Sequence, residues 1–315
     1  MKIRGGTMGS SFGRAESHRF RNRTVGFWLC TLLVAVLGLG WSCCEAGPKD
    51  KPRNAKRRAS EEAETPASGP DFGETATGST SSTESGGATT LRDAIDFAIE
   101  SREVVRELKD YTARFVKFER IGNNLVHQEM DMKFRAKPFS VYFLYQSQKE
   151  QGRQAIFVEG RNNNNLLVKE AKGLAGAVGV VPLRLDDHRV KKENLYPVTQ
   201  VGIANMLEET IKEWEHDLKV PGDQVEVLFY PNAKVEGQPC QAIEVTHLKR
   251  MKEIRFWRNR IYFDRETRIP IRGERYGWAR SAGEKAPLME DYKYLNLRTN
   301  VNLTDADFTT RKYGF

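Results

Sequence analysis

The stretch "KPFSVYFLYQSQ", residues 137–148, carries bulky apolar side chains at both parities. Successive side chains of a β-strand point to opposite faces of the sheet, so a strand with one wet face alternates apolar and polar residues. Here one face would present Val141, Phe143 and Tyr145, and the other would present Tyr142 and Leu144. Both faces of this strand must therefore be covered. A helix, a partner or a lipid could provide the second cover, and the fold depends on which does.

The segments on either side of this stretch predict further strands. A period of two begins after Asp110, and "YTARFVKFER" (111–120) turns at "IGNN" into "LVHQEMDMKFR" (125–135), a hairpin with one wet face. Two more strands follow at 152–160 and 165–171, and five similar segments occupy residues 224–298. About ten short strands at meander spacing predict one large antiparallel sheet, which must curl at this size.

Two amphipathic helices are predicted to lie on this sheet. The first begins at Leu91 with Thr90 as its cap, and the second occupies residues 199–218 with Thr199 as its cap. The second helix has an apolar stripe that includes Trp214 and Leu218, so it is the leading candidate to cover an apolar sheet face. The predicted fold class is α+β: a large curved antiparallel sheet, an incomplete barrel, closed by two main helices.

The first ninety residues predict export rather than a folded domain. Residues 24–44 carry no charge and follow several arginines, so residues 1–46 are either a signal peptide cleaved after Ala46 or an N-terminal membrane anchor. Residues 47–90 contain Phe72 as their only large apolar residue and predict a disordered linker. The folded domain, residues 91–315, is then expected in the cell envelope, either free in the periplasm or held to the inner membrane by residues 24–44.

The chemistry-bearing residues argue against an enzyme. Cys240 is the only cysteine of the domain, which excludes an intradomain disulfide and a cysteine-based metal site. The five histidines are scattered, and no zinc-protease, Walker or dinucleotide motif occurs. We therefore predict no catalytic residues, no metal and no cofactor. The net charge of +8 is too mild to indicate a nucleic-acid partner.

Two segments stay open to more than one interpretation. The basic and aromatic segment 247–265, "HLKRMKEIRFWRNRIYFDR", suits single-stranded nucleic acid, anionic lipid head groups, or simply a barrel strand with outward basic side chains. The glycine-rich segment 173–183, "GLAGAVGVVPL", reads either as an apolar lid or as a crossover packed on the sheet edge. We favour the strand for the first segment and the crossover for the second.

The stretches "YFDRETRIPIRGERY" (262–276) and "NVNLTDADF" (300–308) carry a family resemblance. With them, residues 105–310 resemble a bacterial envelope family, a domain whose function is unknown. That family is similar in turn to the lipoprotein carriers LolA and LolB. The resemblance implies an incomplete antiparallel barrel closed by helices over an apolar cavity that takes acyl chains, but it transfers no binding residue.

Together these observations predict a non-enzymatic envelope module that shelters a lipid or a lipoprotein acyl chain. Residue type and strand parity select five cavity-lining side chains: Phe139, Phe143, Phe157, Trp214 and Trp257. The membrane would be a second partner, through the N-terminal segment, and nucleic acid would not be one. The alternative is a structural envelope protein that binds another protein and has a fully packed cavity. A hydrolase or transferase is the third possibility.

Overall fold

The computed structural model describes residues 90–171 and 179–315. The predicted signal peptide or anchor and nearly all of the predicted linker lie outside the described residues, as does most of the glycine-rich segment. No helix in the described ranges is both long and apolar enough to cross a membrane.

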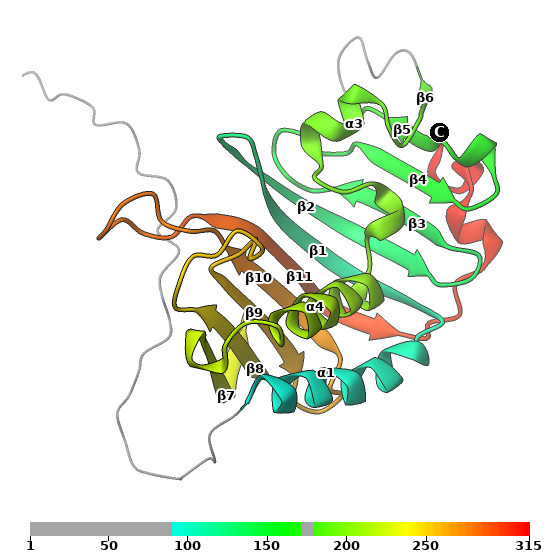
Figure 1. Ribbon diagram of the computed structural model, residues 1–315. Coiled ribbons are helices and arrows are strands. Elements are labelled where there is room, and N and C mark those ends of the chain that lie inside the picture. The colour runs from blue at the N-terminus through cyan, green and yellow to red at the C-terminus, as the bar shows by residue number, and fades with distance from the viewer. Residues whose placement is uncertain (1–89, 172–178) are drawn as a thin grey trace, which may run out of the picture. The chain divides into compact units, whose positions relative to one another are not determined.

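The described residues form one antiparallel sheet of eleven strands and a few helices (Figure 1). The strands are β1 (Asp110–Ile121), β2 (Asn124–Arg135), β3 (Ser140–Tyr145), β4 (Gln154–Val158), β5 (Leu166–Lys169), β6 (Val180–Leu183), β7 (Val225–Val235), β8 (Gln238–His247), β9 (Arg258–Asp264), β10 (Pro270–Tyr276) and β11 (Leu288–Thr299). The predicted fold class is confirmed. The strand beyond the predicted ten is β6, which pairs with β5 at the sheet edge.

The strand order shows how the sheet is assembled. It runs β6-β5-β4-β3-β2-β1-β11-β10-β9-β8-β7, so β1 to β6 make one meander and β7 to β11 make a second. The first strand joins the two meanders by pairing with the last, from Tyr111 opposite Thr299 to Glu119 opposite Glu290. Strands β6 and β7 are the two edges, and the sheet stays open.

The first helix, α1 (Leu91–Arg106), begins where predicted, with a capping box between Thr90 and Asp93. The predicted start of the second helix is wrong. Helix α4 (Ile203–Asp217) is capped by Gly202, and Thr199 lies in a preceding 3₁₀ turn, η2 (Val198–Gln200).

The start of α4 is set by contacts with the sheet. The N–H groups of Gly202 and Ile203 donate to the hydroxyls of Tyr294 and Tyr111 at 3.2 and 3.1 Å. Gly202 has a φ of 125°, and a Cβ at this position would lie 3.0 Å from the ring of Phe134. A glycine is therefore needed where the chain passes this close to the sheet.

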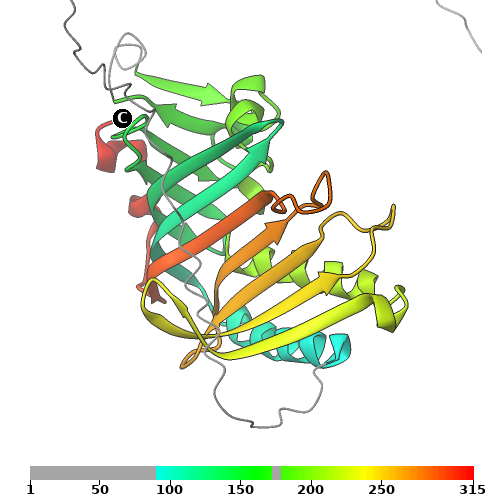
Figure 2. The same cartoon turned by 90° about the vertical axis from the view of Figure 1, so that its left-hand side faces the viewer.

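Both α1 and α4 lie on the same face of the sheet, which we call the inner face (Figure 2). The apolar side of α4, including Leu207, Ile211 and Trp214, is buried against inner-face residues such as Ile261. Leu218, predicted to belong to this stripe, follows the last helical residue and is 40 % exposed. The helices thus cover the second meander more fully than the first.

The outer face of β3 is covered by the end of the chain. We call residues 303–315 the C-terminal strap; it contains two 3₁₀ turns, η4 (Asp305–Phe308) and η5 (Thr310–Tyr313). Phe308 is buried with Tyr142 of β3, and the ring of Tyr313 stacks on that of Tyr142 with centroids 3.8 Å apart. The second apolar face of the 137–148 stretch is therefore covered by this chain itself, and neither a helix nor a ligand is needed there.

Candidate functional site

A cavity of about 150 Å³ lies on the inner face, between the central strands and the segment that leads into α4. Its apolar end is lined by Phe115, Met130, Phe143, Tyr145, Ala155, Leu166, Val190, Val198, Met206 and Tyr294, among others. A second hollow of about 330 Å³ adjoins it, because Val190, Asn194, Tyr196 and Pro197 line both. Residues 190–197, from α3 (His188–Glu193) onward, thus form a wall shared by two hollows.

The other end of the cavity is polar. Its charged lining comes from four elements and one loop, and consists of Lys117, Glu119, Glu209, Glu213, Arg255, Arg275 and Glu290. Strand β1 contributes to both ends of the cavity. Every second residue of a strand points to the same face, so Phe115, Lys117 and Glu119 all line the cavity. One strand therefore supplies both an apolar wall and a buried ion pair to the same cavity.

Lys117 is buried and engages three partners. Its Nζ lies 3.0 Å from the Glu119 carboxylate, 3.1 Å from the carbonyl oxygen of Glu193 and 2.5 Å from Oδ1 of Asn194. Burial lowers the pKa of Lys117, and the Glu119 charge opposes this effect. Glu119 also accepts hydrogen bonds from the Leu195 N–H at 2.9 Å and from a tyrosine hydroxyl of β11. This ion pair therefore fastens the shared wall to the sheet.

A second buried group of charges centres on Arg275. Its guanidinium lies 3.0 Å from Glu213 of α4 and 3.5 Å from Glu290 of β11. Burial raises the pKa of Glu213, although Arg275 opposes the shift, and Asn259 donates to the same carboxylate at 2.6 Å. Tyr196 donates to Glu290 at 2.7 Å, and burial together with the Glu290 charge raises its pKa to about 12. Helix, sheet and shared wall thus meet at one polar cluster.

Of the five side chains predicted to line the cavity, Phe143 does so, and the other four lie elsewhere in the described structure. Phe139 and Phe157 pack edge to face with ring centroids 5.9 Å apart, and Trp214 is buried between α4 and the sheet. Trp257 lies at the end of the loop before β9, where the guanidinium of the following arginine is 4.7 Å from its ring. The role of these residues in binding stays a prediction.

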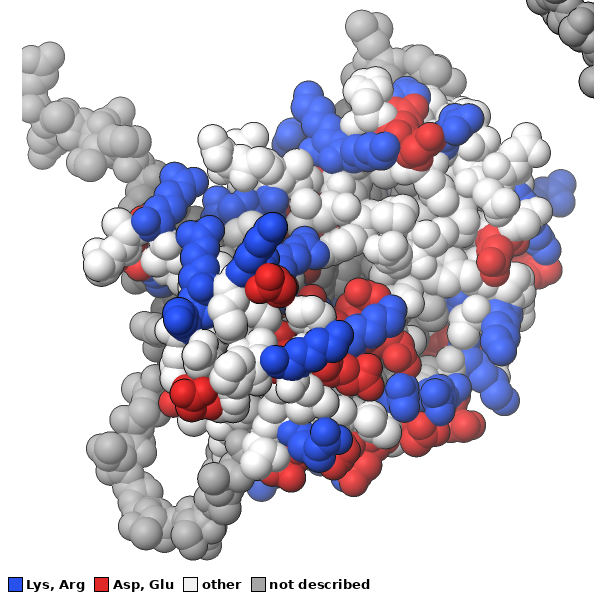
Figure 3. All heavy atoms as spheres, in the orientation of Figure 1, with Lys and Arg blue, Asp and Glu red and all other residues white. Residues whose placement is uncertain are grey.

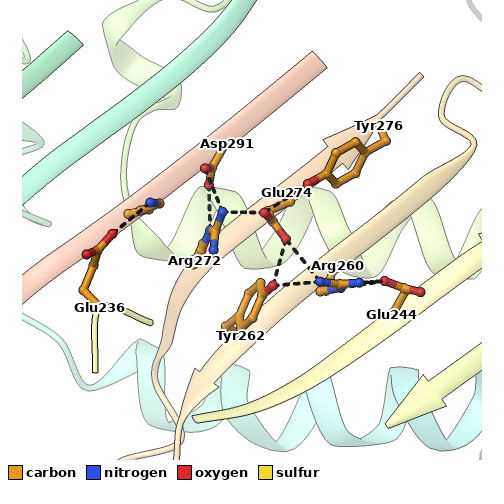
Figure 4. A network of polar contacts seen from close by, with 9 residues as sticks. Glu236, Glu244, Arg260, Tyr262, Arg272, Glu274, Tyr276 and Asp291 are labelled. Carbon is orange, nitrogen blue, oxygen red and sulfur yellow. Dashed lines mark hydrogen bonds and ion pairs between the residues drawn. The ribbon is translucent and has the colours of Figure 1, made fainter. Parts of the chain in front are cut away.

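Two arginines of segment 247–265, Arg258 and Arg260, pair with Glu244 on the neighbouring strand. Figure 4 shows the network around Arg260. Arg260 bonds to Glu244, and the hydroxyl of Tyr262 donates to Glu274 at 2.9 Å. Arg272 on the next strand lies 3.0 Å from a carboxylate of β11. These charges are neutralised within the sheet, as expected for a strand with outward basic side chains.

Metal ligands do not gather in the part of the chain that the structure describes: no three histidine, cysteine or acidic side chains lie close enough to hold an ion. Cys240 is fully buried, and burial raises the pKa of its thiol to about 11. A thiol with so high a pKa is a poor nucleophile at neutral pH. Its surroundings are those of a small core residue.

Several solved structures resemble the chain. A DUF1329 family protein from Desulfovibrio piger is 14% identical, with 71% of this chain and 99% of that one covered and a TM-score of 0.31. For MucB the identity is 14%, the coverage 69% and 62%, and the TM-score 0.39. For a LolA superfamily protein from Nitrosomonas europaea they are 12%, 70% and 98%, and 0.29. These likenesses concern the fold alone.

In sequence, no curated protein matches the chain. Residues 108–315 match the model of one protein family, described as a protein of unknown function (DUF1571). This confirms the resemblance to a family of unknown function that the motifs at 262–276 and 300–308 indicated. The chain belongs to the DUF1571 family.

Proposed function

We propose that the domain is a non-enzymatic binding module of the cell envelope that shelters part of an amphipathic lipid or a lipoprotein acyl chain in its inner-face cavity. The observation that carries the proposal is the cavity itself, which is apolar at one end and charged at the other. Each methylene group buried at the apolar end contributes about 0.8 kcal/mol. The unfilled space on this face supports a binding role over the alternative, a structural envelope protein whose cavity is fully packed.

The size of the cavity limits what it holds. An apolar cavity of roughly 150 Å³ accepts a benzene-sized molecule. A long acyl chain therefore needs the adjoining hollow as well, and the shared wall at residues 190–197 must shift to join the two. We propose that short chains enter as the structure stands and that long chains displace the wall.

The charges at the polar end favour a head group without net charge. Three cations face three carboxylates, each in an ion pair: Lys117, Arg255 and Arg275 against Glu119, Glu213 and Glu290. Glu209, the remaining charged lining residue, pairs with Lys212 at 2.7 Å. A ligand carboxylate would meet carboxylates and no unpaired cation, whereas hydroxyl or amide groups can bond to either sign.

Native mass spectrometry of the gently purified full chain tests the proposal, together with displacement of a fluorescent acyl probe. We expect co-purifying lipid, and we expect a monoacylglycerol to displace the probe at least about tenfold better than the fatty acid of equal length. Absence of both bound lipid and probe uptake would refute the binding function. Equal displacement by the two competitors would refute only the neutral head group.

A matched pair of variants locates the site. Ala155 is buried and lines the cavity from β4, so Ala155→Phe should fill the apolar end and weaken probe binding at least about tenfold. Ala204 is exposed on α4, and the same change there should leave binding unaltered. Thermal unfolding of both variants separates a filled cavity from a damaged fold. Equal probe affinity in the two variants would place the ligand elsewhere.

A further inference from the structure

Two loops stand side by side at one end of the sheet. Because the strands alternate in direction, residues 248–257 between β8 and β9 and residues 277–287 between β10 and β11 emerge at the same end. The loops join at their bases, where the N–H of Trp257 donates to the carbonyl of Tyr276 at 2.9 Å. Figures 1 and 2 both show the yellow and orange loops next to each other.

These loops carry a surplus of unpaired cations. We call Lys249, Arg250, Lys252, Arg280 and Lys285 the basic rim. All five are exposed, and within the described ranges none of them has a side-chain hydrogen bond or an ion pair, unlike the arginines of the outer-face network. The two loops contain only two carboxylates, Glu253 and Glu284. Figure 3 shows basic side chains gathered over this position, at the left-hand edge of the molecule.

An apolar side chain stands at the start of the rim. Leu248 is 62 % exposed, the highest value among the large hydrophobic residues of the described part, and Met251 follows three positions later. A single exposed leucine needs no explanation by itself. Here, however, three rim cations follow it within four positions, Lys249, Arg250 and Lys252. Cations beside a large apolar group are typical of segments that lie at an anionic lipid surface.

The rim also adjoins the candidate cavity. Arg255 belongs to the loop 248–257, lines the polar end of the cavity and lies 3.2 Å from Glu290. A membrane or other surface that contacts the basic rim would therefore face the polar end of the cavity. We propose that the basic rim docks the domain onto an anionic lipid bilayer, with the polar end of the cavity turned toward the head groups. This docking does not depend on whether the cavity holds a ligand.

Hydrogen exchange of the full chain tests the docking without interference from residues 24–44, because it reports on the rim itself. The protein is reconstituted in phosphatidylcholine vesicles with and without phosphatidylglycerol. We expect slower exchange at residues 248–257 and 277–287 only when phosphatidylglycerol is present, and loss of this protection at high salt. The turns at the opposite end of the sheet should exchange equally in both vesicle types.

Charge reversal supplies a matched comparison. Lys249→Glu with Arg250→Glu removes two rim cations, each of which strengthens binding to an anionic surface about fivefold, so the anionic lipid needed for half-maximal protection should rise at least about 25-fold. Lys234→Glu with Arg265→Glu makes the same charge change at the opposite end and should have no such effect. Far-ultraviolet circular dichroism and thermal unfolding establish that both variants are folded.

Three outcomes would overturn the proposal. The first is equal protection of the rim on pure phosphatidylcholine. The second is an equal loss of protection in the two double variants. The third is equal protection by single-stranded DNA at the same charge concentration in place of vesicles, because that would assign the rim to polyanions in general.

Discussion

The C-terminal strap makes a quantitative prediction about stability. Phe308 is 3 % exposed and packs with Tyr142, Ile156 and Val158, and the guanidinium of Arg135 lies 4.9 Å from its ring. Replacing a buried phenylalanine by alanine costs about 3–5 kcal/mol. Because this cluster is small and lies at the end of the chain, we expect Phe308→Ala to lower the free energy of unfolding by about 3 kcal/mol. In a domain of this size that corresponds to a fall in Tm of roughly 6–12 °C.

Urea denaturation measures the effect, with the change read from the midpoint at an unchanged slope. Phe229→Ala is the matched control, because Phe229 lies on edge strand β7, is 38 % exposed and meets Phe97 with ring centroids 6.1 Å apart. We expect that variant to lose about 1 kcal/mol or less. Hydrogen exchange at residues 303–315 should also accelerate in Phe308→Ala.

The reasoning fails if the two variants lose equal stability. It also fails if Phe308→Ala changes neither the midpoint nor the exchange of the strap. Either result would mean that the strap does not cover the outer face of β3 and β4 in solution. The question raised by the 137–148 stretch would then need a different cover for Tyr142.

Four further variants test a buried ion pair, a titratable histidine on β2 and the close approach of the chain at the start of α4. Lys117→Met leaves the Glu119 carboxylate buried without its cation and should cost about 3–5 kcal/mol in urea denaturation, and adding Glu119→Leu should recover part of that loss. Burial lowers the pKa of His127 from its usual 6.5, so below about pH 6.5 the unfolded chain binds a proton that the folded chain resists. Stability should therefore fall as the pH drops from about 7 toward 5, and His127→Gln should flatten this decline in urea midpoints measured across that range. Gly202→Ala combines a φ of 125° with a Cβ placed 3.0 Å from the ring of Phe134, so we expect a loss above about 1 kcal/mol, visible as a lower Tm in a calorimetric scan.

The sequence predicts the architecture because its periods are local. Alternation in β2 places Met130 and Met132 on the inner face, and alternation in β9 likewise places Asn259, Ile261 and Phe263 there. The first helix carries its own capping signal. Each of these features depends on a few neighbouring residues, so a single sequence suffices for them.

The features that were missed depend on contacts between distant segments. Thr199 is a good cap by residue type, but hydrogen bonds to two tyrosine hydroxyls fix the start of α4 at Gly202. Nothing local in residues 303–315 indicates that their apolar side chains pack on β3. These positions depend on which segments meet in the folded chain, and no sequence period records that.

One feature of the sequence could have predicted the polar end of the cavity. In "ARFVKFER" (113–120), Phe115 shares its face with Lys117 and Glu119, while Val116 and Phe118 point to the opposite face. Neither face of the strand is therefore purely polar. A charged pair two residues apart within such a strand indicates a buried ion pair. Strand parity does not govern Trp257, because this residue precedes the first residue of β9, so its selection depends on residue type alone and its role in binding stays a prediction.

The pairing of the first strand with the last has a consequence for how the domain folds and opens. Each meander can form from local hairpins, but the seam between β1 and β11 must wait for the end of the chain, so folding is expected on the millisecond to second scale of high contact order. The cavity is lined from both sides of this seam, by Phe115 and Lys117 of β1 and by Glu290 and Tyr294 of β11. A ligand held there would contact both meanders, which fold separately. Local opening along the β1–β11 seam would then release the ligand without unfolding either meander.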